Sequence, residues 1–217
     1  MLSGGCTQKK LLIVALLAVG LLVFGCLDNG QPPAGNNSSS KYSEGNASAA
    51  IIVTVYSDFQ CPFCGVSEPQ ENKFLQDHSA EVKMEFRNFP LGMECNSLLQ
   101  YEMHPFACKA AEAAECAADQ KKFWEYHHML FANQGNLGTA DLKKYAADLG
   151  LDSAQFDQCL DSGVKSEAVK KDIAQGIVLG IDSTPTIFMN GKKVEFSRID
   201  QVYAALDSAL ADAKKGN

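Results

Sequence analysis

Apolar residues are grouped along the chain in a pattern that predicts strands and helices in alternation. Residues 50–57 form a β-branched apolar run bounded by polar sequence, which is typical of a buried strand. Residues 81–89 alternate apolar and charged side chains and end at Pro90, which predicts a second strand. Between these two strands, a helix is expected from Cys61 to about residue 78.

The long segment that follows is mainly helical in pattern, and strands return only near the end. Amphipathic or Ala-rich stretches predict helices within 104–119, 119–134, 139–150, 153–161 and 164–179. Residues 184–196 place two short apolar runs around Asn190-Gly191, a strong hairpin signal, and residues 199–210 carry the apolar stripe of a last helix. This order predicts an α/β domain over residues 50–217, with a helical insertion at about 92–180.

The segment before this domain has a different composition. Lys9 and Lys10 precede a short apolar run that ends just before Cys26, which is typical of an export signal. Residues 1–26 are therefore predicted to be a lipoprotein-type membrane anchor with lipid on Cys26, although Phe24 is larger than is usual there. The alternative is an uncleaved anchor in which Cys26 is incidental. Residues 27–49, rich in Gly, Pro, Asn and Ser, are predicted to be a flexible linker.

Charge excludes one class of partner. The chain has 217 residues and a formal net charge of −7, and its few basic residues form no patch or stripe. We therefore expect no nucleic-acid partner.

Both interpretations of the N-terminus place the domain outside the cytoplasm, tethered to the outer face of the cell membrane.

Two cysteines, Cys61 and Cys64, follow the first strand at the spacing CxxC. Such a pair can be a redox centre, half of a metal site or a structural disulfide. A cysteine at a helix N-terminus faces unpaired backbone N–H groups and the positive end of the helix dipole, which stabilise the reactive thiolate. Cys61 is therefore expected to be the exposed nucleophile, and Cys64, one turn further, the resolving thiol.

The motifs DFQCPFC and STPT, separated by the helical insertion, resemble those of the DsbA-like thiol–disulfide oxidoreductases of the thioredoxin superfamily. The resemblance covers about residues 50–213. It implies a thioredoxin fold with an inserted helical subdomain, a cis Thr184–Pro185 bond packed against the CxxC, and pairing of an extended substrate with the Thr184 backbone. It also implies exported protein thiols or disulfides as substrates, and a membrane redox partner of the DsbB or VKOR kind.

The residues between the cysteines, Pro62 and Phe63, are expected to tune the pair. Strongly oxidising relatives usually have histidine at the position of Phe63, and phenylalanine cannot donate a hydrogen bond to the thiolate. We therefore expect Cys61 to be less acidic than in those relatives, and the disulfide to be a milder oxidant. Family members often have a buried acid beneath the second cysteine. Asp58 and Glu85 are the candidates, although the simpler interpretation, that both are solvated surface charges, is favoured.

Four further cysteines of the domain are expected to form structural disulfides, because an oxidising compartment favours pairing. Cys108 and Cys116 are predicted to share one helix, too far apart along its axis to be bonded. Of the two remaining connectivities we favour Cys95–Cys108 and Cys116–Cys159, because Cys95 precedes Cys108 most closely. Loop-closure entropy predicts that they stabilise the fold by roughly 3 and 4 kcal/mol.

No metal or cofactor is expected. Adjacent helical residues such as His127 and His128 point in different directions and make a poor chelate, so His127 is expected to be a packed core residue. The favoured function is an extracytoplasmic enzyme that introduces or exchanges disulfides in exported proteins. The alternatives are a disulfide reductase or isomerase, or a non-catalytic metal-binding or interaction module.

Overall fold

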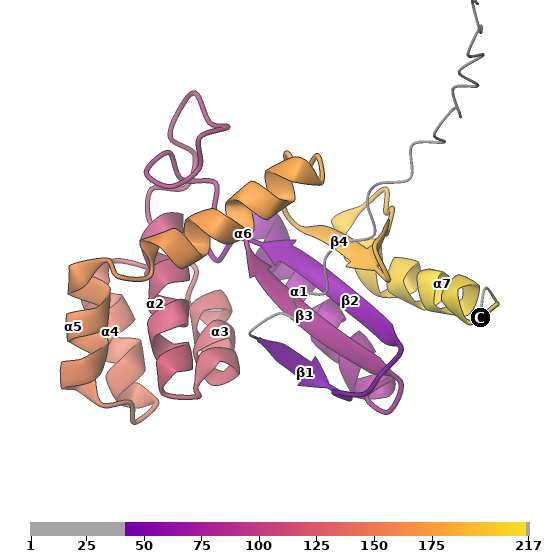
Figure 1. Ribbon diagram of the computed structural model, residues 1–217, viewed down its shortest axis with the longest axis horizontal. Helices are drawn as coiled ribbons and strands as arrows, with labels where there is room; N and C mark the ends of the chain where they lie inside the picture. The colour runs from indigo at the N-terminus through magenta and orange to yellow at the C-terminus, as the bar shows by residue number, and fades with distance from the viewer. Residues whose placement is uncertain (1–41, 216–217) are drawn as a thin grey trace, which may run out of the picture. The chain divides into compact units, whose positions relative to one another are not determined.

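The structure, a computed structural model, describes residues 42–215 (Figure 1). The predicted anchor with Cys26, and the linker up to residue 41, lie outside the described residues. The strands are β1 (Ser43–Gly45), β2 (Ile51–Ser57), β3 (Val82–Asn88), β4 (Thr186–Met189) and β5 (Lys192–Lys193). The helices are α1 (Pro62–Asp77), α2 (Ala107–Asp119), α3 (Phe123–Ala132), α4 (Thr139–Asp148), α5 (Ser153–Ser162), α6 (Ser166–Val178) and α7 (Val202–Lys215), with a 3-10 turn η1 (Ile199–Gln201) before α7.

The strands form one sheet in the order β1-β3-β2-β4-β5. β2 and β3 run parallel, and β4 runs antiparallel to β2 with Thr186 opposite Tyr56. The ends of β2 and β3 therefore lie at the same edge of the sheet as the beginning of β4. This topology brings three loops together, namely the loops after β2, after β3 and before β4.

Strand β1 corrects the prediction of a linker that extends to residue 49. Residues 43–45 pair antiparallel with β3, and the Tyr42 ring stacks on Phe123 at 3.9 Å between centroids. An edge strand is held by its ladder hydrogen bonds and by one neighbour, so it does not need the apolar alternation that reveals a central strand. The polar composition of this segment therefore concealed its structure.

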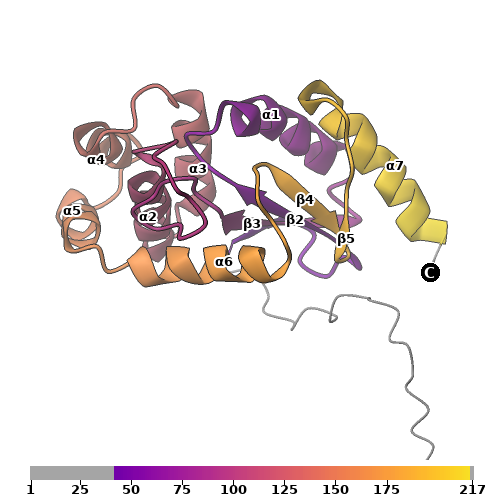
Figure 2. The ribbon, with the colours of Figure 1, turned by 90° about the horizontal axis from the view of Figure 1, so that it is seen from above.

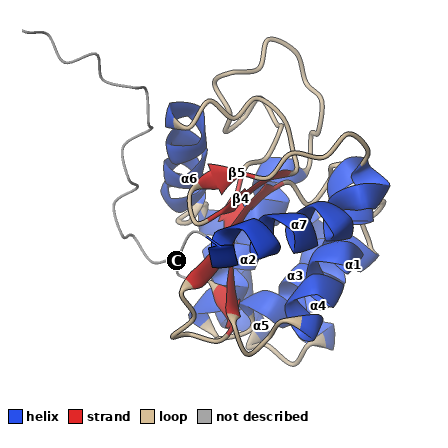
Figure 3. Ribbon diagram, turned by 90° about the vertical axis from the view of Figure 1, so that its right-hand side faces the viewer, coloured by secondary structure: helices blue, strands red, loops and turns tan. Residues whose placement is uncertain are grey.

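Helices cover both faces of the sheet. In Figure 2, α1 and α7 lie on one side of the strands and α6 lies on the other, and Figure 3 shows the strands between these helices. Buried side chains of β2, β3 and β4 pack against α1 and α7 in one cluster, and Phe89 and Phe188 pack with Val169 and Ile173 of α6 in another. A third cluster joins α2–α5 to the sheet through Phe59 and Phe86. Among the described residues, no helix is both long and apolar enough to cross a membrane.

Candidate active site

Cys61 and Cys64 lie where β2 passes into α1. Cys61 is the N-cap of α1 with extended backbone (φ −69°, ψ 121°), and Pro62 occupies the first helical turn, where its missing N–H costs no hydrogen bond. Both cysteines are free thiols. The expectation that Cys61 is exposed is wrong, because Cys61 is 3% and Cys64 1% exposed. The loop before β4 contacts Cys61.

That loop contains Thr184 and Pro185, joined by a cis peptide bond as the resemblance implied. The Thr184 carbonyl oxygen lies 3.5 Å from Cys61 Sγ and accepts a hydrogen bond from the thiol. The register of β4 against β2 explains this contact, because Thr186 and Tyr56 face each other only a few residues from the two groups. Residues that are more than 120 positions apart in the sequence, Cys61 and Thr184, thus meet at one edge of the sheet.

The two thiols have opposite acidities. Hydrogen bonding from the Cys64 thiol is the main cause that lowers the pKa of Cys61, to about 6. Burial opposes this effect, while the Thr184 side chain and the Cys64 backbone N–H lower the pKa further. The pKa of Cys64 is raised, first by burial and then by its neighbour Cys61. At neutral pH the pair therefore favours a thiolate on Cys61 and a thiol on Cys64, the arrangement that a nucleophile and a resolving thiol require.

Phe63 points outward, with 61% of its surface exposed. It lines an open groove together with Thr184 and Pro185, and residues 196–200 also line this groove. An extended peptide laid in this groove would pass beside the Thr184 backbone. The expectation that Phe63 makes Cys61 less acidic than in histidine-containing relatives stays a prediction.

Of the two candidate acidic helpers, only Asp58 belongs to the site. The Asp58 backbone donates a hydrogen bond that favours the Cys64 thiolate, and its carbonyl accepts the Cys61 N–H at 3.1 Å. Glu85 lies within the sheet and forms an ion pair with Lys83 at 2.8 Å. The interpretation that both are solvated surface charges is wrong, since Asp58 is 1% and Glu85 5% exposed.

Two polar residues of the site, His104 and Gln134, and one buried acid further along α1, Glu71, escaped sequence analysis. His104 Nδ1 lies 2.6 Å from Asp58 Oδ2, and Gln134 Nε2 donates to the carbonyls of Phe59 and Cys61, each at 2.9 Å. Glu71 lies on the buried face of α1, as Cys64 does, and is hydrogen-bonded by Ser67. His104 and Gln134 come from loops whose approach depends on the fold. The only sequence signal for Glu71 was its place in the helical periodicity, seven residues after Cys64.

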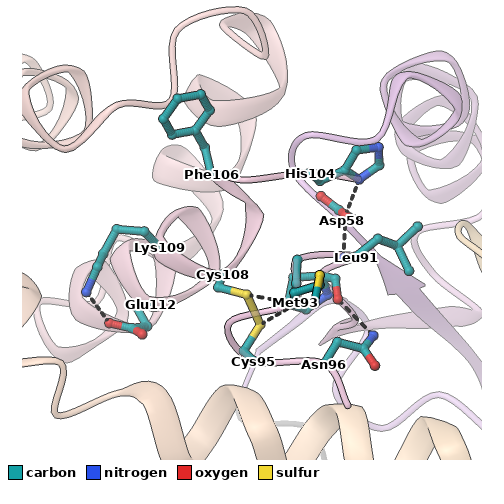
Figure 4. The surroundings of a disulfide bond; sticks show 12 residues. Asp58, Leu91, Met93, Cys95, Asn96, His104, Phe106, Cys108, Lys109 and Glu112 are labelled. Carbon is teal, nitrogen blue, oxygen red and sulfur yellow. Dashed lines mark hydrogen bonds and ion pairs between the residues drawn. A yellow bond between two sulfur atoms is a disulfide. The ribbon is translucent and has the colours of Figure 1, made fainter. Parts of the chain in front are cut away.

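The remaining four cysteines form the two favoured pairs. Cys95–Cys108 and Cys116–Cys159 are disulfides, each with a Cα–Cα distance of 5.9 Å. The first closes the loop that carries His104, as Figure 4 shows, and the second ties α2 to α5.

The two adjacent histidines differ in environment. His127 is 3% exposed and packs against the rings of Phe59, Phe86 and Phe131, as expected for a core residue. His128 Nδ1 lies 2.8 Å from Glu68 Oε1. One ligand atom from each of Glu68, His127 and His128 lies within 4.8 Å of the others, closer than the helical directions of two adjacent residues suggested.

Comparison with known proteins agrees with this geometry. A family profile described as "Thioredoxin" matches residues 38–208, most of the chain. The chain belongs to the thioredoxin family. Solved thioredoxin-fold proteins similar to it include BdbD of Bacillus subtilis, with a TM-score of 0.65 and 21% identity over 78% of this chain and 90% of that chain. Another is the thiol-disulfide exchange protein alpha-DsbA2 of Wolbachia pipientis, with a TM-score of 0.61 and 18% identity over 77% and 86%.

The fold is therefore the thioredoxin fold with the DsbA-like helical insertion. Sequence comparison also finds longer relatives. A Salinispora tropica protein named Na(+)/H(+) antiporter NhaA 3 is 36% identical over 171 residues, which are 78% of this chain and 25% of that protein. This thioredoxin-family chain thus spans about a quarter of the length of the curated relatives that it matches, and the antiporter name describes those whole proteins.

Proposed function

We propose that this chain is an extracytoplasmic thiol–disulfide oxidoreductase that acts on exported proteins through Cys61 and Cys64. The observation that carries the proposal is the asymmetry of the pair. Cys61 has a lowered pKa at the N-terminus of α1, while Cys64 is buried with a raised pKa. The similar protein from Wolbachia is a thiol-disulfide exchange protein, which supports the same chemistry here.

In the oxidising direction, a substrate thiolate attacks Cys61 Sγ of the Cys61–Cys64 disulfide. The S–S bond breaks, and Cys64 leaves as a thiolate that takes up a proton. A second substrate thiolate then attacks the substrate sulfur of the mixed disulfide and releases Cys61 as a thiolate. The substrate loses two electrons and the enzyme gains them, so an acceptor must reoxidise the pair; we propose a membrane protein of the DsbB or VKOR kind.

The proposed path of the substrate is the groove beside Phe63 and Thr184, because Thr184 lines this groove and also contacts Cys61 Sγ. An extended segment would follow this path by pairing with the Thr184 backbone, in the manner of an added strand.

An extracytoplasmic location is supported by the two structural disulfides, because such bonds form and persist in oxidising compartments. Anchoring through Cys26 belongs to the same proposal and rests on the sequence pattern alone.

The test is substrate trapping. With Cys64→Ser, the Cys61 thiolate can still attack the disulfide of an exported protein and displace one of its thiols. The resulting mixed disulfide should accumulate, because Cys64 is no longer present to attack Cys61 Sγ and release the bound protein. Cys61→Ser should trap none and should lose disulfide exchange with a model dithiol peptide. Exchange activity that survives in Cys61→Ser would contradict the proposal. The reduction potential then gives the direction: a value between about −120 and −180 mV indicates an oxidase or isomerase, and one near −270 mV a reductase.

A further inference from the structure

A charged group reaches the active-site turn from an element that is distant in sequence. His104 lies in the loop between β3 and α2, and its Nδ1 is 2.6 Å from Asp58 Oδ2. The Asp58 side chain is completely buried, and the His104 side chain is 15% exposed. Figure 4 shows Asp58 between His104 and Leu91.

Asp58 organises the turn that leads to Cys61. Its Oδ1 accepts the Gln60 N–H at 2.7 Å, its Oδ2 accepts the Leu91 N–H at 2.7 Å, and its carbonyl accepts the Cys61 N–H. A second link joins the same two segments, because the Phe106 N–H donates to Gln60 Oε1 at 2.8 Å. The loop of His104 is thus attached to the turn of Cys61 at two points.

The negative charge of Asp58 disfavours the thiolate of the nucleophile, Cys61. A buried carboxylate needs compensation, and two backbone N–H groups supply part of it. Its negative charge also raises the pKa of Cys61, since it opposes a thiolate nearby. A protonated His104 cancels this charge. Phe63, which lies between the two cysteines, has no charge and cannot do so.

The charged groups that face His104 favour its protonation. The hydrogen bond to Asp58 is the largest cause that raises the pKa of His104; burial lowers it, and the charges of Asp58, Cys61 and Glu102 raise it. These three groups come from the loop after β2, the start of α1 and the loop of His104 itself.

We propose that His104 is a positioning residue for the Cys61–Cys64 pair: its imidazolium neutralises buried Asp58, fixes the turn before Cys61 and thereby favours the Cys61 thiolate. The Cys95–Cys108 disulfide closes the loop that holds His104 in place. This role rests on the proposed function, because it assigns His104 to the chemistry of the same pair.

The two partners of the hydrogen bond should act in opposite directions. His104→Gln leaves Asp58 charged and should raise the pKa of Cys61 by about one unit, a tenfold loss of thiolate well below that pKa. Asp58→Asn removes the negative charge and should lower the pKa of Cys61. The measurement is the ultraviolet absorbance of the thiolate against pH in the reduced protein. The same tenfold change in the redox equilibrium corresponds to about 30 mV in the reduction potential, which should be lower in His104→Gln, so that this variant is a weaker oxidant.

His78→Gln is the matched control. His78 also pairs with a carboxylate, Glu81 at 3.1 Å, but it lies at the far end of α1. This variant should leave the pKa of Cys61 unchanged. Shifts in the same direction for His104→Gln and Asp58→Asn would indicate a loosened turn and overturn the proposal.

A second measurement uses the unmodified protein, in case a variant fails to fold. Protonation of His104 and ionisation of Cys61 are linked, so His104 should titrate at higher pH in the reduced protein than in the Cys61–Cys64 disulfide form. NMR titration of the imidazole measures this difference. Equal titration in both forms overturns the role of His104. The outcome is independent of the trapping experiment, since it needs no substrate and no turnover.

Discussion

Glu71 makes the stability of this protein depend on pH. Its carboxyl is buried on the inner face of α1, and burial raises its pKa from an ordinary 4.5 to about 7. The hydrogen bond from Ser67 opposes the rise, and the charge of Glu68 adds to it. We therefore expect Glu71→Gln, which removes the ionisable proton and keeps the shape, to stabilise the protein at neutral and alkaline pH.

The magnitude follows from linkage between protonation and folding. The folded state holds the Glu71 proton more tightly than the unfolded chain, so its contribution is fully present below pH 4.5 and is lost as the pH rises through about 7. At about 1.4 kcal/mol per pKa unit, the loss amounts to about 3 kcal/mol. A glutamine side chain at this position does not ionise, so the variant avoids this loss.

The assay is urea unfolding of the oxidised proteins between pH 4 and 8, evaluated as the difference between wild type and variant so that shared groups cancel. The free energy of unfolding of Glu71→Gln, relative to wild type, should increase by about 3 kcal/mol from the acid end to the alkaline end of this range. Asp77→Asn, on the same helix, is the control. The hydrogen bond from Lys73 lowers the pKa of Asp77. The difference in the free energy of unfolding between Asp77→Asn and wild type should therefore change only as the pH falls below about 4. A difference for Glu71→Gln that stays flat across neutral pH would refute the reasoning.

Three further perturbations test the site and its support. Gly65→Ala would place a Cβ 2.0 Å from Gln134 Oε1 and disturb the side-chain amide that donates to the carbonyls of Phe59 and Cys61. We expect this variant to lose about 1–2 kcal/mol of stability and to exchange disulfides more slowly. Gly135→Ala, with open space around it, should change neither property. Replacing Cys116 and Cys159 together by Ala should lower the free energy of unfolding by about 4 kcal/mol without altering the pKa of Cys61, and a change in that pKa would show that the disulfide is not merely structural. Phe63→His should raise the reduction potential by at least about 30 mV in a glutathione equilibrium, and an unchanged potential would mean that position 63 does not tune the pair.

Much of the fold could be predicted because it is encoded locally. The β-branched run of β2, the alternation in β3 and the Asn190-Gly191 turn each specify their own structure, and all three elements were found near their expected positions. Strand β1 was missed, since its stability comes from pairing with β3 rather than from its own side chains. The same distinction applies to Cys61, whose place at a helix N-terminus was predictable and whose burial was not.

The sequence by itself determined the chemistry of this protein: a CxxC pair after a strand, a distant Thr184–Pro185, and four cysteines with few ways to pair. These features depend on residue type and spacing, which are properties of the chain. The tertiary structure alone decided which polar groups surround the pair. His104 and Thr184 reach Cys61 or its turn because the parallel alignment of β2 with β3 and the antiparallel alignment with β4 bring three loops to one edge of the sheet. Gln134 reaches the Cys61 carbonyl from the loop that follows α3. Long-range contacts of this kind set the electrostatics of the thiolate, since charge acts through space and not along the sequence.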